Sequence, residues 1–449
     1  MNTPDKSVNA WILLSEDDPQ GTNYTSPNSD YQMLIKYGVY KYVDMLSMCF
    51  AVTVPVSAPP GTPPSYTIAM QAASHGPYTN QQYMDFVIRD SRKVNPNIKI
   101  LITLDPADGG NWLSMIFSGD QSQWRSQATS YANNVVAYLQ ANNLDGFDID
   151  WEFPLSTNTS QAQMTLVLQA LRTAFNTPSK TYLLTLSPAV ANNLDGAVVN
   201  DTVDFLNLQL YSGFTNPQDF INAGISKSLL AYGAKFEWEN QLKPHQNAQN
   251  AYQGYSSGGY NVITQWRLNS NDYQFEQAQQ MILYQLVYGI PGTSFDDTQI
   301  IGAAGNPPIT QVVIRSGDVL DAIQATNTGS FQTPPSPAFP LQYVLLPHGG
   351  EGGTANTITI SKDDPVVQVS GFRGVWYGWN CVLQITLKTR SGKVFGPYGT
   401  MNNATLEIPF QYNAPANQSI VAFSGSIVQV PSGGGGTTDI IESLNVSYA

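Results

Sequence analysis

The pattern of apolar and polar residues divides the chain into a long first part and a shorter second part. From residue 8 to about residue 290, short apolar runs alternate with segments of helical periodicity. In the segments 122–142 and 164–175, apolar residues recur at steps of three and four, which is typical of amphipathic helices. The runs that have the length and composition of buried strands are Ala10–Leu14, Val43–Val52, Ile98–Leu104, Leu144–Phe153, Tyr182–Leu186, Val203–Tyr211, Leu229–Lys235 and Val262–Trp266.

This alternation indicates an α/β fold. Eight strands that alternate with helices over roughly 280 residues predict a (β/α)8 TIM barrel, for which about 250 residues is typical. A doubly wound sheet is the structural alternative, but no glycine-rich phosphate turn follows the first predicted strand. The prolines between Pro55 and Pro64 predict that 53–82 is a long loop at the rim of the barrel.

The second part begins after Gly289 and has a different texture. It is rich in Gly, Val, Ile and Thr, it alternates apolar and polar positions, and it contains no convincing helical pattern. The pairs Ser316-Gly317, Ser370-Gly371 and Ser424-Gly425 each end an apolar run, and they lie 54 residues apart. Equal spacing of one strand-and-turn unit predicts a three-fold all-β domain, since each sheet needs its neighbours to bury a core. The predicted domains are therefore 1–290 and 291–449.

The charge of the chain excludes some classes of partner. Acidic residues number 33 against 20 basic ones, the net charge is −13, and the basic residues are scattered. Binding to a phosphate backbone requires clustered Lys and Arg, so nucleic acid is not an expected partner. Only 12% of the residues are charged, against roughly 25% in an average domain. Neutral hydrogen-bonding groups and aromatic rings take their place. Such groups suit sugars, although they are also ordinary solubilising surface.

Metal, disulfide and membrane chemistry are not indicated. His75, His245 and His348 are isolated, and no Cys/His cluster has the spacing of metal ligands, so neither a metal nor a cofactor is expected. Cys49 and Cys381 fall in separate predicted domains, so no disulfide framework follows.

No apolar run approaches the roughly 18 residues of a membrane span. The first residues contain no basic stretch followed by an apolar region, so no standard secretory signal is expected.

The most informative segment is Leu144–Pro154, with the sequence LDGFDIDWEFP. Side chains alternate faces on a strand, so Asp148, Asp150 and Glu152 point to one side and the apolar residues between them to the other. In a barrel the apolar set packs against the helices, and the acids point inside. Three neighbouring buried carboxylates cost several kcal/mol, so catalysis is a better explanation for them than folding. Mutual repulsion and burial raise the pKa of at least one of them, which keeps a proton available. The alternative is an exposed acidic edge strand.

The same residues resemble the signature of the family 18 glycoside hydrolases, which include chitinases and endo-β-N-acetylglucosaminidases. The family pattern on the fourth barrel strand is DGxDxDxE, and this chain reads DGFDIDWE. The resemblance implies that Glu152 protonates the leaving oxygen. It also implies that Asp150 holds the acetamido group of the substrate and that Asp148 shares a proton with Asp150. The implied nucleophile is the substrate's own N-acetyl carbonyl, which gives an oxazolinium intermediate and retained configuration.

Further site residues follow from this resemblance. The run from Val203 to Tyr211 resembles the sixth strand, on which Gln209 and Tyr211 would share one face and contact the reacting acetamido group. The alternative for both Tyr211 and Gln209 is a packing role, in which the side chain fills the interior of the barrel. Trp266 matches the tryptophan of the eighth strand that floors the sugar. Trp112 and Trp238 are candidate sugar platforms at outer subsites, with buried packing as the alternative for each. The chain departs from the family at Leu104–Gly110, where SxGG is expected, and at Ser212, where many chitinases carry Asp.

The second part resembles a jacalin-related lectin domain from about Gly292 to the last residue. The segments that carry the resemblance, in order, are Gln311–Ile323, His348-Gly349-Gly350, Val366–Gly371 and Ile385–Gly399. The family fold is a β-prism of three four-stranded sheets. Sugar binding without metal is implied for Gly292 and for a GxxxD loop that contains Gly435, Gly436, Thr437 and Asp439. An Asp beside backbone N–H groups can both accept from and donate to sugar hydroxyls. The alternative is a prism without binding that acts as a spacer.

These observations predict a retaining, substrate-assisted hydrolase that cleaves β-1,4 linkages of N-acetylglucosamine, in chitin or chitooligosaccharides, with the lectin domain holding it near glycan surfaces. One alternative is an endo-β-N-acetylglucosaminidase that acts on N-glycans. Another is a non-catalytic protein that binds chitin or other glycans. The presumed substrates suggest an extracellular setting.

Overall fold

The computed structural model describes residues 4–14, 23–27, 29–36, 38–57, 59, 61, 63–72, 74–75, 77–105, 111–152, 160–177, 180–236, 244–269, 273–288, 294–331, 339–431 and 437–449. The chain forms two compact units. The first unit comprises Met1–Glu237 and Ala251–Glu276, and the second comprises Trp238–Asn250 and Gln277–Ala449.

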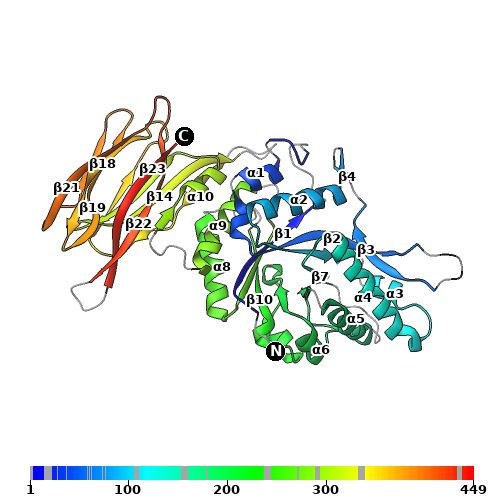
Figure 1. Ribbon diagram of the computed structural model, residues 1–449. Helices are drawn as coiled ribbons and strands as arrows, with labels where there is room; N and C mark the ends of the chain where they lie inside the picture. The colour runs from blue at the N-terminus through cyan, green and yellow to red at the C-terminus, as the bar shows by residue number, and fades with distance from the viewer. Residues whose placement is uncertain are drawn as a thin grey trace. The chain divides into compact units, whose positions relative to one another are not determined.

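The first unit contains a closed barrel of eight parallel strands (Figure 1). The strands are β1 (Ser7–Leu13), β2 (Met45–Pro55), β6 (Lys99–Leu104), β7 (Gly146–Trp151), β8 (Leu183–Pro188), β9 (Phe205–Leu208), β10 (Leu230–Lys235) and β11 (Val262–Trp266). Each strand pairs in parallel with its neighbours, and β1 closes the ring by pairing with both β2 and β11. The predicted (β/α)8 barrel is confirmed, and each of the eight predicted strands overlaps an observed one.

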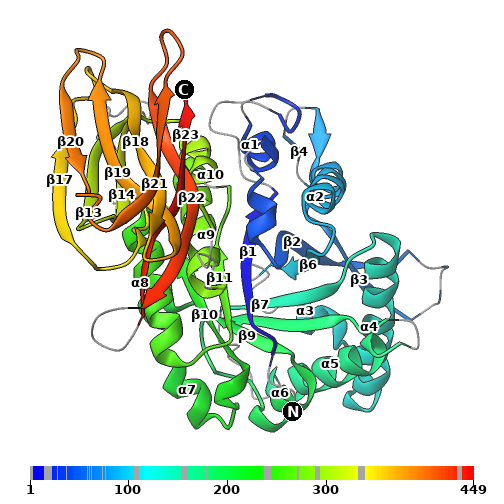
Figure 2. The ribbon, with the colours of Figure 1, turned by 60° about the vertical axis from the view of Figure 1, so that its left-hand side comes forward.

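Helices cover the outside of this ring (Figures 1 and 2). Those of the first unit are α1 (Asp30–Lys36), α2 (Asn80–Val94), α3 (Asn111–Ile116), α4 (Trp124–Ala141), α5 (Ser160–Phe175), α6 (Gly196–Thr202) and α7 (Pro217–Asn222). The chain continues with α8 (Pro244–Gly258) and α9 (Tyr273–Tyr288). The two segments of strong helical periodicity correspond to α4 and α5, whose apolar stripes are buried. In the part of the chain that the structure describes, no helix combines the length and the apolar character that a bilayer crossing requires.

Apolar side chains fill one end of the barrel. The members of this cluster lie near the N-terminal ends of five strands and are Met45, Leu101, Phe205, Ala231 and Val262. A packed layer at this end leaves the C-terminal ends of the strands for polar groups, which is where barrel enzymes carry their sites.

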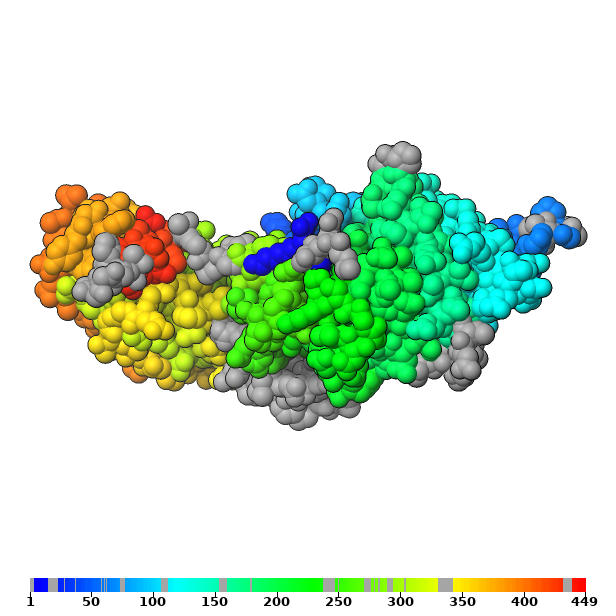
Figure 3. All heavy atoms as spheres, turned by 90° about the horizontal axis from the view of Figure 1, so that it is seen from below, coloured from blue at the N-terminus to red at the C-terminus, as the bar shows by residue number. Residues whose placement is uncertain are grey.

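The prediction of a long loop over 53–82 is wrong in part. Residues Tyr66–Met70 form β3, which pairs antiparallel with the end of β2, and the short strands β4 (Ser74–His75) and β5 (Tyr78–Thr79) follow. Pro55 is the last residue of β2, and Pro59, Pro63 and Pro64 lie between β2 and β3, outside both strands. The resulting hairpin, in blue, projects from the surface of the first unit (Figure 3).

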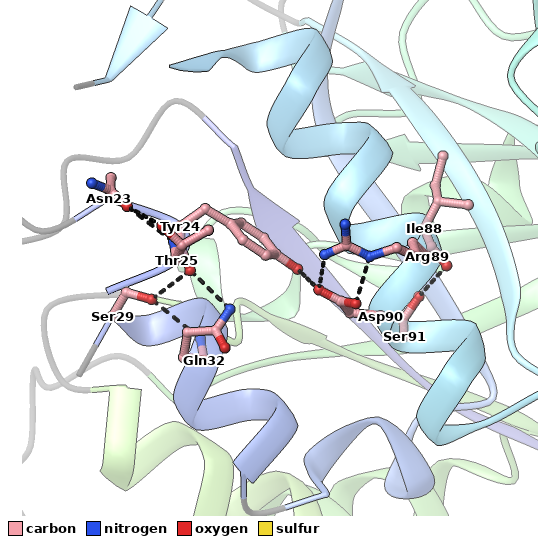
Figure 4. Close-up of polar contacts among 9 residues, drawn as sticks. All are labelled: Asn23, Tyr24, Thr25, Ser29, Gln32, Ile88, Arg89, Asp90 and Ser91. Atoms are coloured by element: carbon pink, nitrogen blue, oxygen red, sulfur yellow. Dashed lines mark hydrogen bonds and ion pairs between the residues drawn. The ribbon is translucent and has the colours of Figure 1, made fainter. Parts of the chain in front are cut away.

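The segment after β1 is fastened to α2 (Figure 4). The buried Tyr24 donates its hydroxyl hydrogen to Asp90 at 2.8 Å, and Arg89 donates to both carboxylate oxygens of Asp90 at 2.8 and 2.7 Å. The main-chain carbonyl of Tyr24 accepts hydrogen bonds from Ser29 at 3.1 Å and from Gln32 at 2.9 Å. These contacts hold the entry to α1 against α2, in a loop that leaves the C-terminal end of a barrel strand.

The start of β7 is fixed by Asp145. Its carboxylate accepts hydrogen bonds from Arg92 at 2.9 Å, from Lys180 at 2.8 Å and from the main-chain N–H of Ile100 at 2.9 Å. Partial burial opposes ionisation, but Lys180 and the Ile100 amide outweigh it and hold the pKa of Asp145 below its ordinary value. The acid that opens the DGxDxDxE motif therefore anchors the strand that carries the other three.

The second unit contains three sheets of antiparallel strands. The first sheet consists of β15 (Phe339–Val344), β14 (Leu320–Phe331), β13 (Ile309–Ser316) and β17 (Thr354–Thr359), with β16 (His348–Gly349) paired to β14. The second consists of β20 (Val394–Tyr398), β19 (Trp379–Thr389), β18 (Val366–Trp376) and β21 (Ala404–Asn413). The third consists of β12 (Ser294–Asp296), β22 (Ile420–Pro431) and β23 (Thr437–Tyr448), and α10 (Thr298–Ala303) follows β12. The predicted all-β domain of three sheets is confirmed.

The prediction that each Ser-Gly pair ends a strand is wrong for two of the three pairs. Ser316 does end β13, but the pairs at 370–371 and 424–425 lie within β18 and β22. A Cβ on Gly371 would lie 1.8 Å from the main-chain oxygen of Gln384, and one on Gly425 would lie 2.0 Å from that of Ser443. The pairing register shifts just after these two glycines. At 371 and 425 the repeat therefore marks a close backbone approach beside a bulge, for which only glycine has room.

Candidate active site

The three predicted carboxylates stand in a row along β7 and just beyond its end. Asp148 is fully buried, Asp150 is 8% exposed, and Glu152 follows the last residue of the strand and is partly buried. The alternate residues Phe147 and Ile149 are also fully buried. Burial on both faces excludes the alternative of an exposed acidic edge strand, because an edge strand would leave the acids in solvent.

Asp148 is held by two hydroxyl groups from β8. Thr185 donates to one carboxylate oxygen at 2.5 Å, and Ser187 donates to the other at 2.8 Å. Burial raises the pKa of Asp148 to about 6, although both hydroxyls act in the opposite direction by stabilising the charged form. Asp148 is therefore a carboxyl group that can gain or lose a proton in the physiological range.

Asp150 and Glu152 are joined through one amide. The Nε2 of Gln209 donates at 3.1 Å to Asp150 Oδ1 and lies 3.1 Å from Glu152 Oε1 and from the main-chain oxygen of Ser187. Burial, followed by the charges of Glu152 and Asp148, raises the pKa of Asp150 well above its ordinary value. Asp148, Asp150 and Glu152 are therefore close enough for the charges of Asp148 and Glu152 to act on Asp150.

The strand alternation that predicts a common face for Gln209 and Tyr211 does not hold. The strand β9 ends at Leu208, and Gln209 precedes a 3-10 turn, Leu210–Ser212, so the two-residue alternation of a strand does not extend to Tyr211. Gln209 nevertheless reaches the carboxylates, because it leaves the strand end pointing into the barrel. Tyr211 is half-buried.

Trp266 ends β11 and belongs to an aromatic group at the C-terminal ends of three neighbouring strands. Its ring centre lies 5.9 Å from that of Trp11 on β1 and 6.2 Å from that of Phe50 on β2. Trp266 is only partly buried, and the guanidinium of Arg267 lies over its ring, 5.7 Å from the ring centre. An aromatic ring at this end of the barrel suits the apolar face of a pyranose ring.

Trp112 and Trp238 are the other two predicted sugar platforms, and the structure describes only Trp112. Trp112 is only 2% exposed and stacks on Tyr131 of α4 at 6.2 Å between ring centres. A ring that helices enclose offers no face to a sugar, so the packing alternative holds and the predicted platform is wrong. Trp238 lies outside the described residues.

A polar chain that the sequence did not predict runs across the barrel from Asp148. Ser187 accepts a hydrogen bond from the side-chain amide of Asn207 at 3.3 Å, and Asn207 accepts one from Thr264 at 2.6 Å. A usable signal was present, since Thr185 and Ser187 are polar residues two apart in an otherwise apolar strand. Asp105, just after β6, is a further buried acid near Asp150, and it is paired with Gln71.

We expect Asp148→Asn to stabilise the folded chain at high pH. The folded-state pKa of about 6 lies above the unfolded value of roughly 3.9, so the folded state retains a proton that the unfolded state has lost. The corresponding stability is present below about pH 4 and is lost as pH rises through about 6. The variant is expected to gain on the order of 1–3 kcal/mol in free energy of unfolding at pH 8 and nothing at pH 4. Urea denaturation at both pH values measures this, and an equal change at the two pH values would contradict it.

The predicted lectin residues are only partly visible. Gly292, Gly435 and Gly436 lie outside the described residues, whereas Thr437 and Asp439 belong to β23. A Cβ on Gly350 would lie 2.5 Å from the main-chain oxygen of Asp439, so the His348-Gly349-Gly350 segment packs directly against this strand. Gly350 and Asp439, which are 89 residues apart in the chain, are thus in contact.

Cysteine and metal chemistry give no further site. Cys49 and Cys381 are both buried and free. Within the described ranges, no three His, Cys, Asp or Glu side chains are grouped so that they could hold a metal ion.

Comparisons with known proteins agree with this architecture. Residues 22–296 match the family described as "Glycosyl hydrolases family 18", and residues 286–430 match the "Jacalin-like lectin domain". An endochitinase of Brugia malayi is 33% identical over 90 residues, which are 20% of this chain and 16% of that protein. Chitinase 1 of Aphanocladium album is 26% identical over 228 residues, which are 48% of this chain and 46% of that protein.

These matches span less than half the length of either relative. Among solved structures, a class V chitinase from Nicotiana tobaccum aligns with a TM-score of 0.44 and 13% identity, over 62% of this chain and 99% of that one. The first family match covers more than half of the chain and includes the whole carboxylate row. The protein therefore belongs to the family 18 glycosyl hydrolases, and a jacalin-like lectin domain follows the barrel in the sequence.

Proposed function

We propose that this protein is a retaining, substrate-assisted hydrolase that cleaves β-1,4 linkages of N-acetylglucosamine in chitin or chitooligosaccharides. The observation that carries the proposal is the arrangement of Asp148, Asp150 and Glu152, with Gln209 donating between the last two. Structural stability gives no reason to collect three carboxylates in one enclosed volume, whereas proton transfer requires such a cluster.

In the proposed reaction, Glu152 donates its proton to the leaving glycosidic oxygen. The acetamido carbonyl of the substrate attacks the anomeric carbon, which forms an oxazolinium ion and expels the shortened sugar as an alcohol. Asp150 accepts the acetamido N–H and stabilises the positive charge, and Asp148 holds the proton that Asp150 exchanges. Water, deprotonated by Glu152, then opens the oxazolinium ion and restores the acid.

The remaining proposed roles concern substrate position. The face of Trp266 supports the apolar side of the sugar at the reacting position. Tyr211 binds the acetamido group from the turn after β9. The jacalin-like lectin domain tethers the enzyme to glycan surfaces, which raises the local concentration of substrate. The proposed setting is extracellular, and its support is that substrates of this kind lie outside cells.

Product analysis with two substrates tests the proposal. The protein is incubated with chitotetraose and, separately, with an N-glycoprotein, and the products are identified by mass spectrometry and by NMR of the new anomeric centre. We expect chitobiose and related fragments with the β-configuration. Release of N-glycans alone would replace the proposal with an endo-β-N-acetylglucosaminidase, and no cleavage of either substrate would favour a glycan-binding protein without activity.

A further inference from the structure

The second unit contains a groove of about 570 Å³ between its second and third sheets. One side is formed by residues of β21 and of the adjoining ends of β18 and β19, and the other by residues of β22 and β23. Figure 2 shows the course of these strands. The volume falls within the range of small-molecule sites, which is roughly 300–1,000 Å³. Asp439 is not among the described residues that line this groove.

The β21 side of the groove is apolar. Leu406, Ile408 and Phe410 of this edge strand all line the groove. Leu406 is 73% exposed and Ile408 is 49% exposed, so neither belongs to the core of the prism. Exposed apolar side chains gathered along one wall are typical of an interaction site.

The facing side is polar. Apart from Leu444, it is formed by Ser426 on β22 and by Glu442, Ser443 and Asn445 on β23. The hydroxyls of Ser426 and Ser443 lie 2.7 Å apart and form one hydrogen bond. Hydroxyl and amide groups both donate and accept, whereas a carboxylate only accepts. This wall therefore offers hydrogen-bonding groups of both kinds.

The charge of the groove excludes strongly charged ligands. Arg373 on β18 and Glu442 on β23 are the charged residues among those that line it, and their charges cancel. A polyanion would meet Glu442, and a polycation would meet Arg373. The ligand is therefore expected to be uncharged, with an apolar face and a hydrogen-bonding rim.

The edge strand β21 is poorly suited to pairing with another strand. Pro409 has no N–H to donate to a ladder, and Leu406 has a φ of 52°, which departs from extended geometry. Both features oppose the addition of a peptide strand or of a second copy through main-chain hydrogen bonds. The occupant must instead be recognised by side chains.

We propose that this groove is a second carbohydrate-binding site of the lectin domain, which takes an uncharged oligosaccharide. A pyranose ring has an apolar C–H face, which would rest on Ile408 and Phe410. Its hydroxyls both donate and accept, as the polar wall requires. The site does not depend on catalysis in the barrel or on Asp439.

The test uses the full-length chain with Glu152→Gln and Asp439→Ala, so that neither turnover nor the predicted loop contributes. Mannotriose, lactose and cellotetraose, which lack N-acetyl groups, serve as probes in saturation-transfer NMR and in titration calorimetry. We expect at least one of them to bind. Adding Phe410→Ala or Glu442→Gln is expected to weaken that binding about tenfold or more.

Glu407→Gln on the opposite face of β21 is the matched control and should bind as the parent does, with all variants showing unchanged circular dichroism. The proposal is overturned if none of the three sugars binds the parent, or if the groove variants bind with the parent's affinity. It is also overturned if the chain self-associates in analytical ultracentrifugation and Ile408→Asp abolishes that association, since the groove would then hold a second copy.

Discussion

Glu152→Gln is expected to lower the rate of chitotetraose cleavage by about 10²–10⁴-fold while sugar binding is kept. Glutamine has nearly the same shape as glutamate, and its side-chain oxygen can still accept the hydrogen bond that Gln209 donates at 3.1 Å. It carries no proton acidic enough to protonate the leaving oxygen. Initial rates from product mass spectrometry, together with calorimetric affinity for chitotetraose, separate the two effects.

Glu407→Gln is the matched control, because this residue is exposed on β21 of the second unit. The control should cleave at the parental rate. Equal rates for the Glu152 variant and the parent would remove Glu152 from the role of acid. A parallel loss of binding and rate would show instead that Glu152 orients the substrate.

Removal of the acetyl groups from the substrate is expected to slow cleavage by about a thousandfold or more. If the acetamido carbonyl is the nucleophile, it is already positioned next to the anomeric carbon, and intramolecular attack of this kind supplies several kcal/mol of barrier lowering. Tetramers of glucosamine lack that carbonyl. Their cleavage rate is compared with that of chitotetraose at saturating concentration of each.

A partially acetylated chitin polymer provides the internal control for this experiment. Mass spectrometry of the fragments should find N-acetylglucosamine at every new reducing end, because only that sugar can attack its own anomeric carbon. New reducing ends that carry glucosamine would mean that a protein carboxylate is the nucleophile. Asp150 would then be the first candidate, since it lies beside Glu152 in the same enclosed volume.

The sequence by itself determined the fold and the chemical core of the site. Parallel barrel strands are buried on both faces, so they read as continuous apolar runs, and all eight were predicted. The acids at 148, 150 and 152 interrupt such a run at every second position. That period is a local property of a strand, and it puts them on one face whatever the rest of the chain does.

The tertiary structure alone decided which other groups meet them. Thr185, Ser187 and Gln209 reach the carboxylates from β8 and from beyond β9, and their contacts depend on strand register and on where β9 ends. Trp112 became a core residue because helix packing enclosed it. Periodicity along the chain specifies the face on which a side chain lies. Which neighbour it contacts is set by packing between segments far apart in sequence, and for that reason only the folded protein showed it.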